Sequence, residues 1–114
     1  VLYFDTKMKP IGMEIVAIGG TKACIVETSN IFKGAIAANA TAIAMVHNHP
    51  SGSISPSKQD FYMTNQMAMA GELLGIPLVD HLILGREDFY SFKKAHPGVR
   101  LSEVEQIPRK SCED

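Results

Sequence analysis

The sequence has little cysteine, no long apolar run and almost no excess of either charge. Its two cysteines, Cys24 and Cys112, form no C-x-x-C pair and have no zinc-finger spacing, so we expect a reduced protein in the cytoplasm. The apolar stretches are short and interrupted by charge or glycine, which predicts no membrane span. No basic stretch followed by an apolar core begins the chain, so we also expect no signal peptide.

The length of 114 residues fits one domain with a modest core. A formal net charge of -1 gives no support for binding nucleic acid through its phosphates, although a local basic patch is compatible with it. The chain begins at Val1 and not at methionine, which leads us to expect that an upstream segment can be missing. The composition indicates no oligomeric state.

Alternation, apolar runs and turn residues divide the chain into short elements. They predict strands over residues 1–5, 11–20, 22–28, 41–48, 77–85 and 89–95, and helices over residues 29–40 and 57–75. The first three strands suggest an antiparallel meander, and the apolar run 41–48 suggests a strand covered on both faces. Residues 96–114 mix both charges and are expected to form a solvated tail. The order of elements predicts an α/β sheet with helices packed on it.

Two histidines stand where the apolar strand 41–48 runs into a loop. Because alternate residues of a strand share a face, His47 and His49 should project together. Asp60 follows in the first turn of the helix 57–75, where its carboxylate is favoured by the helix dipole. Two imidazoles and one carboxylate form a common catalytic zinc set that leaves a fourth position for water. The spacing therefore predicts a zinc site at His47, His49 and Asp60.

The same residues have a purely structural interpretation. Ser57-Lys58-Gln59-Asp60 fits a helix capping box, with aspartate in the place usually taken by Glu or Gln. His81, beside Asp80 in the predicted strand 77–85, is expected to be a hydrogen-bonded structural residue. Its alternative is to orient a metal-binding histidine, since such ligands are usually held by a neighbour.

The combined pattern resembles a known family. His47-x-His49, seven residues and then Ser57-x-x-Asp60 is the JAMM signature of the JAB/MPN zinc metalloproteases, and "HNHPSG" with "AGELLGIPLVDHLILG" resembles their bacterial RadC branch. The resemblance implies a mixed sheet flanked by helices, like that of cytidine deaminases, over residues 1–95, with 96–114 as a C-terminal tail. The sequence departs from the branch where V-H-P-R-E is usual: Val26-Glu27-Thr28 stands there, without the histidine and arginine.

The resemblance also implies roles in catalysis. Glu14, in a predicted strand, is expected to accept the proton of the zinc-bound water, with Glu27 as the next candidate. Glu14 has the alternative of facing outward from its strand. Ser57 is expected to donate a hydrogen bond to the oxyanion, with helix capping as its alternative.

Two functions remain open on these grounds. The first is a zinc-dependent hydrolase of amide bonds, peptide or isopeptide, with a peptide or protein as substrate. The second is a non-catalytic metal-binding module of a RadC-like protein associated with DNA repair. A zinc deaminase is excluded because the H-x-E and P-C-x-x-C motifs are missing. A nuclease would prefer a richer carboxylate cluster or two metals.

Overall fold

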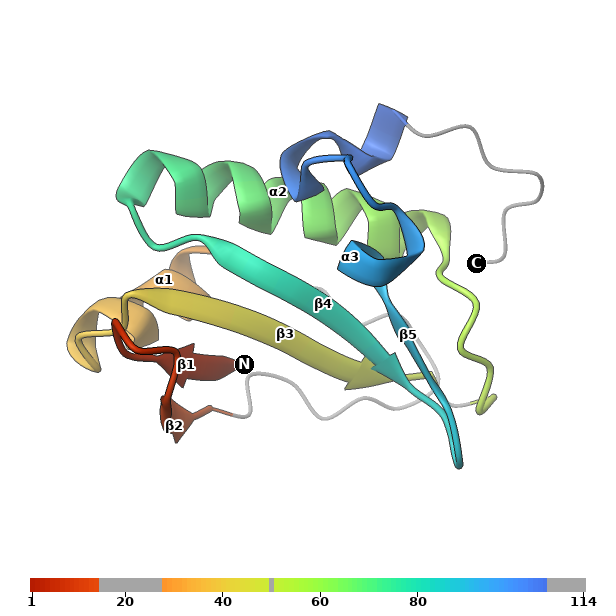
Figure 1. Ribbon diagram of the computed structural model, residues 1–114, viewed down its shortest axis with the longest axis horizontal. Coiled ribbons are helices and arrows are strands. Elements are labelled where there is room, and N and C mark those ends of the chain that lie inside the picture. The colour runs from red at the N-terminus through yellow and green to blue at the C-terminus, as the bar shows by residue number, and fades with distance from the viewer. Residues whose placement is uncertain (15–27, 50, 107–114) are drawn as a thin grey trace.

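The computed structural model describes residues 1–14, 28–49 and 51–106 (Figure 1). Its strands are β1 Leu2–Phe4, β2 Pro10–Met13, β3 Ala42–Asn48, β4 Leu78–Leu84 and β5 Phe89–Ser91. Its helices are α1 Thr28–Ala37, α2 Lys58–Leu74, α3 Phe92–Ala95 and the 3-10 helix η1 Leu101–Gln106. None of the helices in these ranges combines the length and the apolarity that a membrane crossing requires.

The strands form one mixed sheet in the order β2-β1-β3-β4-β5. The central pair β3 and β4 runs parallel, and every other neighbouring pair runs antiparallel. A parallel pair needs a crossover connection, and α2 supplies it between β3 and β4. The predicted α/β sheet with helices packed on it is confirmed.

Helix α2 lies along one face of β3 and β4, and η1 packs against α2 (Figure 1). The largest core cluster joins this helix to α1, β1 and β3 through Met67, Ile31, Tyr3 and Ile43. Residues Ala42–Met45 are buried, as expected for a central strand covered on both faces. This cluster holds the two helices against the first half of β3.

Both ends of α2 follow from local sequence signals. Ser57 is the N-cap, and its side chain accepts a hydrogen bond from the backbone N–H of Asp60. Gly75 ends the helix with φ at +75°, a left-handed conformation that costs glycine little. The predicted bounds of this helix are confirmed to within a residue at each end, so the first turn lies where the spacing predicted it.

The predicted strand 89–95 is wrong in its second half, because the chain turns into α3 after Ser91. Ser91 Oγ accepts a hydrogen bond from the N–H of Lys94 and donates one to Asp80 Oδ2. The other Asp80 oxygen accepts from the N–H of Lys93. These contacts with β4 cap a short helix, although the alternating sequence resembles a strand.

Other expectations hold in part. β1 and β2 form the first hairpin of the meander, while residues 15–27, with the rest of the second predicted strand and nearly all of the third, lie outside the described residues. The solvated tail is wrong for η1, where Val104 is fully buried in a cluster with Phe61, Ile83 and Phe92. Leu101 and Val104 lie three residues apart, so one side of a 3-10 helix carries both onto the core. The domain boundary after residue 95 stays a prediction.

Candidate metal centre

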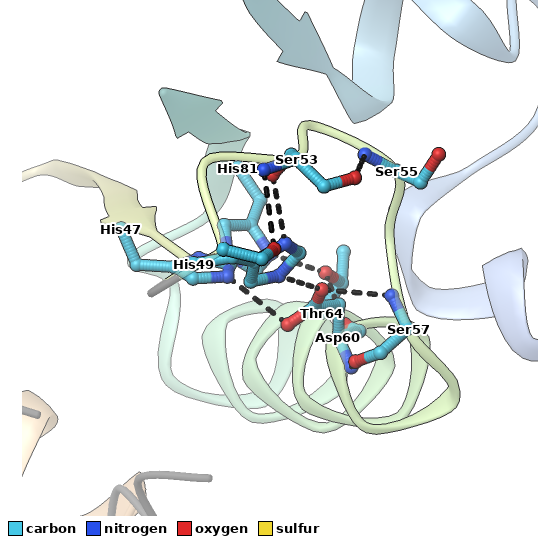
Figure 2. Close-up of polar contacts among 9 residues, drawn as sticks. His47, His49, Ser53, Ser55, Ser57, Asp60, Thr64 and His81 are labelled. Carbon is cyan, nitrogen blue, oxygen red and sulfur yellow. Dashed lines mark hydrogen bonds and ion pairs between the residues drawn. The ribbon is translucent and has the colours of Figure 1, made fainter. Parts of the chain in front are cut away.

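The three expected ligands come together at the end of β3 (Figure 2). His47 is the penultimate residue of that strand, His49 lies just beyond its end, and Asp60 is the third residue of α2. One nitrogen or oxygen atom from each residue lies within 4.8 Å of those from the other two. The predicted convergence of two imidazoles and one carboxylate is therefore present in the fold.

Each imidazole approaches a different oxygen of the Asp60 carboxylate. His47 Nε2 lies 3.1 Å from Oδ1, and His49 Nε2 lies 2.7 Å from Oδ2. Asp60 is only 6% exposed, whereas the two histidines are half-buried. A charged group this far from water needs partners, and the two rings and the helix terminus supply them.

The capping box of α2 is also present, and it includes the candidate ligand. The backbone N–H of Ser57 donates to Asp60 Oδ2 at 2.8 Å, and the N–H of Asp60 donates to Ser57 Oγ at 3.1 Å. The capping and metal-site interpretations of this motif are therefore compatible, since the Asp60 carboxylate serves the helix and faces both histidines.

The carboxylate is held in its charged form. Burial by itself raises the pKa of Asp60, but contacts with His47, the Ser57 N–H and His49 outweigh it, so the pKa lies well below its ordinary value. Asp60 thus presents an anion to both rings at neutral pH.

The loop after β3 fixes the proton of His49. Its Nδ1 lies 3.0 Å from the main-chain carbonyl oxygen of Ser53, and a carbonyl only accepts hydrogen bonds. Nδ1 therefore carries the proton in the neutral ring. The Nε2 atom lies 2.7 Å from Asp60 Oδ2, and because a carboxylate oxygen only accepts, a second proton or a cation has to lie between these two atoms. The contact with His49 uses only the backbone of Ser53.

His47 Nε2 is an orphaned polar atom. It is buried and has no hydrogen-bond partner, although Asp60 Oδ1 is 3.1 Å away, because the geometry is not that of a hydrogen bond. Buried ring nitrogens normally find a partner, so this atom needs an explanation. A cation among His47, His49 and Asp60 would accept both nitrogen lone pairs and the carboxylate charge, and the donor set matches catalytic zinc.

His81 is fully buried on β4 beside this cluster. Its Nε2 lies 2.8 Å from His47 Nδ1, and its Nδ1 is hydrogen-bonded to Thr64 Oγ1 (Figure 2). Burial lowers the pKa of His81 to about 3, so the ring is neutral at pH 7. The expected pairing with Asp80 exists, but the backbone N–H of His81 makes it. The ring of His81 is therefore free to contact His47.

Thr64 was not anticipated as part of the site. It lies four residues after Asp60 on α2, so both side chains project from the same side of the helix. That spacing is the only sequence signal for it, and the spacing is too common to be informative without the position of His81.

Glu14 follows β2 and is not a member of the three-residue cluster. It forms a two-way backbone pair with Val1, which places it on the same sheet face as Tyr3, and the Tyr3 hydroxyl donates to its carboxylate. Tyr3 pairs with Ile43 of β3, and His47 lies four residues further along that strand, on this same face. The role of Glu14 as proton acceptor stays a prediction.

The structure describes some of the remaining candidate residues and not others. Glu27, the second candidate base, lies outside the described residues, as do Cys24 and Cys112. Ser57 Oγ accepts the N–H of Asp60, and within residues 1–14, 28–49 and 51–106 it has no acceptor for its own proton. Its capping role is confirmed, and its role as donor to an oxyanion stays a prediction.

Comparisons with known proteins give a consistent result. Residues 1–98 match the RadC-like JAB domain family. The chain is 40% identical over 94 residues to a UPF0758 protein of Thermotoga maritima, covering 82% of this chain and 42% of that protein. It is 45% identical over 93 residues to a UPF0758 protein of Carboxydothermus hydrogenoformans, covering 82% and 41%.

An archaeal UPF0758 protein, from Methanosarcina mazei, is 42% identical over 92 residues, which cover 81% of this chain and 40% of that protein. The chain thus spans about two fifths of the length of the curated relatives that it matches. Its mixed sheet and helices are consistent with the JAB/MPN fold, and the chain belongs to the RadC-like JAB domain family.

Proposed function

We propose that the protein is a zinc-dependent hydrolase of amide bonds, in peptide or isopeptide linkages. The observation that carries this proposal is the orphaned His47 Nε2, buried beside an anionic carboxylate and a second imidazole. Two neutral imidazoles and one carboxylate hold zinc while leaving a coordination position for water. We also propose that the protein acts in the cytoplasm.

The residues of the chain would divide the work. His47, His49 and Asp60 would hold the ion, and a zinc ion bound there supplies Lewis acidity that makes water a nucleophile near neutral pH. Ser57 Oγ has a proton free to donate, which suits stabilisation of a developing oxyanion. Glu14 lies on the sheet face of His47 and would take a proton from water and return it to the leaving amine.

A second candidate is a metal-binding module without catalysis. It is favoured by the position of Glu14, whose carboxylate is engaged by Tyr3 and does not join the metal cluster. Because the chain spans only part of its relatives, such a module would act with other segments of a longer protein. An association with DNA repair would then be carried by the longer protein, since the net charge of -1 gives it no support here.

One experiment separates these functions. The purified chain is analysed for metal, reconstituted with zinc and tested against a library of peptides and isopeptide-linked peptides, with and without a chelator. A hydrolase should cleave members of the library only with zinc, and Asp60→Ala should be inactive. Stoichiometric zinc without cleavage would favour the module, and no zinc uptake would contradict both.

A further inference from the structure

A line of hydrogen bonds runs away from the metal cluster into the core (Figure 2). It leads from His47 Nδ1 to His81 Nε2, from His81 Nδ1 to Thr64 Oγ1, and from Thr64 Oγ1 to the main-chain carbonyl of Asp60 at 2.8 Å. His81 and Thr64 are both fully buried. The line begins and ends at residues of the cluster, and it joins β3, β4 and α2.

The carbonyl end gives the line a direction. A hydroxyl has one proton, and Thr64 uses it toward the Asp60 carbonyl, which can only accept. Thr64 Oγ1 must then accept from His81 Nδ1, so His81 Nε2 is left with a lone pair. That lone pair accepts the proton of His47 Nδ1, and the proton-free nitrogen of His47 is then Nε2.

The opposite direction is disfavoured by the geometry at the cluster. If Thr64 donated to His81, then His81 Nε2 would donate to His47, whose Nε2 would carry the proton. That proton would need an acceptor, and the nearest candidate is Asp60 Oδ1 at 3.1 Å. The contact does not have hydrogen-bond geometry, so this direction would bury an unsatisfied N–H, whereas in the first direction the proposed cation would accept the Nε2 lone pair.

We infer that His81 and Thr64 are positioning residues that fix the tautomer and the orientation of His47, so that its Nε2 lone pair faces the metal. The inference rests on the proposed metal site. His81 is itself held in place, because its ring stacks on Phe92 with centroids 5.0 Å apart and planes inclined by 10°. Outer partners of this kind typically contribute about 10- to 100-fold to metal affinity.

Asp60 takes part both in the candidate metal site and in the hydrogen-bonded relay. Asp60 offers its carboxylate to the metal and its carbonyl to Thr64, so a displacement of the first turn of α2 would disturb a ligand and the relay together. His49 has a separate and simpler partner in the Ser53 carbonyl. The two histidines are thus fixed independently, His49 from the loop and His47 from the core.

The test compares zinc affinity across matched variants of the full chain, by competition with a chromogenic chelator. Thr64→Val removes the hydroxyl at nearly constant volume, and Thr64→Ser restores it. His81→Phe removes both ring nitrogens and keeps the stacking on Phe92, while His81→Gln keeps a side-chain acceptor for His47. We expect about 10- to 100-fold weaker zinc binding for His81→Phe. A smaller loss is expected for Thr64→Val and His81→Gln, and none for Thr64→Ser.

A second measurement does not depend on metal. Nitrogen-15 NMR of the histidine rings in chelator-treated protein at pH 8 reports which nitrogen of His47 carries the proton. We expect Nδ1–H in the native protein and in Thr64→Ser, and a mixture or Nε2–H in Thr64→Val. If His81→Phe does not fold, the Thr64 pair still decides, because neither change alters the packing of the ring.

The outcomes separate this inference from the proposed function. A native protein that takes up no zinc would contradict the metal site, while the NMR result would still test the relay. Normal zinc binding by the native protein and equally tight binding by folded His81→Phe and Thr64→Val would overturn the inference alone. So would Nε2–H at His47 in the native, metal-free protein.

Discussion

The carboxylate of Asp60 accepts the backbone N–H of Ser57 at 2.8 Å, and the oxygen that accepts it also lies 2.7 Å from His49 Nε2. The start of α2 and the candidate metal site therefore share one atom. A helix cap fixes the first turn to within a narrow geometry, so the ligand is placed by secondary structure before any ion binds.

This sharing predicts that two substitutions of Asp60 behave differently. Asp60→Ala removes both functions, and we expect it to lose zinc and about 1 kcal/mol of stability from the cap. Asp60→Asn keeps an oxygen that can accept the Ser57 N–H but removes the charge, so it should lose zinc and retain most of the cap. Zinc content and urea unfolding of the metal-free proteins check both expectations. Tight zinc binding by Asp60→Asn would contradict the ligand assignment.

Ser57 allows its two roles to be separated by a pair of variants. Ser57→Ala should cost about 1 kcal/mol through the lost cap, whereas Ser57→Gly should cost only a few tenths, because glycine is tolerated at this position. If the free hydroxyl proton serves an oxyanion, both variants should be about 100-fold slower or worse. Melting temperature and rate are compared, and a Ser57→Gly protein with native activity would show that the serine acts only as a cap.

The sequence predicted that His47, His49 and Asp60 come together, because their spacing can be interpreted locally. The spacing of His47 and His49 on a strand, with Asp60 in the following helix turn, is a pattern along the chain. The relay through His81 and Thr64 joins residues that are far apart in the sequence. It forms only because β3 lies parallel beside β4 and α2 packs against them. Tertiary contacts bring His81 and Thr64 to the site, and the spacing of residues in the sequence does not predict those contacts.

The error over residues 89–95 has a similar origin. Ser91 Oγ and the N–H of Lys93 are both held by the carboxylate of Asp80, eleven or more residues earlier in the chain. Alternating residues indicate a strand wherever no such contact exists. A short helix of four residues depends on these caps more than on propensity, so local patterns cannot predict it.

The buried ring of His81 predicts how the stability of the metal-free protein depends on pH. Burial lowers its folded-state pKa to about 3, from about 6.5 when unfolded, so between these values the unfolded state binds more protons. Stability is fully present above pH 6.5 and is lost as pH falls toward 3. The expected loss between pH 7 and pH 5 is about 2 kcal/mol.

Urea unfolding at both pH values, with chelator present, measures this loss. His81→Phe has no titrating ring and should show a smaller loss over the same interval. Burial also lowers the pKa of His96, so that residue contributes with the same sign in both proteins and cancels in the comparison. An equal loss in both proteins would contradict the assignment to His81.

Glu14 and Tyr3 form the contact on which the catalytic proposal most depends. Their strands and β3 are neighbours in the order β2-β1-β3, so Glu14 lies two strand spacings, roughly 10 Å, across the sheet from the strand of His47. Both side chains project from the same face. Our proposal requires the Glu14 carboxylate to leave the Tyr3 hydroxyl and to contact the water at the candidate metal site, directly or through one further water.

Two variants test whether Glu14 acts through its chemistry or through this contact. Glu14→Gln keeps an amide oxygen for the Tyr3 hydroxyl and removes the base, so it should fold, bind zinc and hydrolyse about 10²- to 10⁴-fold more slowly. Tyr3→Phe removes the hydroxyl, keeps the buried ring and leaves the carboxylate free, so its activity should stay near that of the native protein. Rates are measured on zinc-loaded proteins with equal metal content. If both variants lost activity equally, Glu14 would matter only as the partner of Tyr3. If neither variant lost activity, another residue would have to accept the proton, and Glu27 would be the first to test.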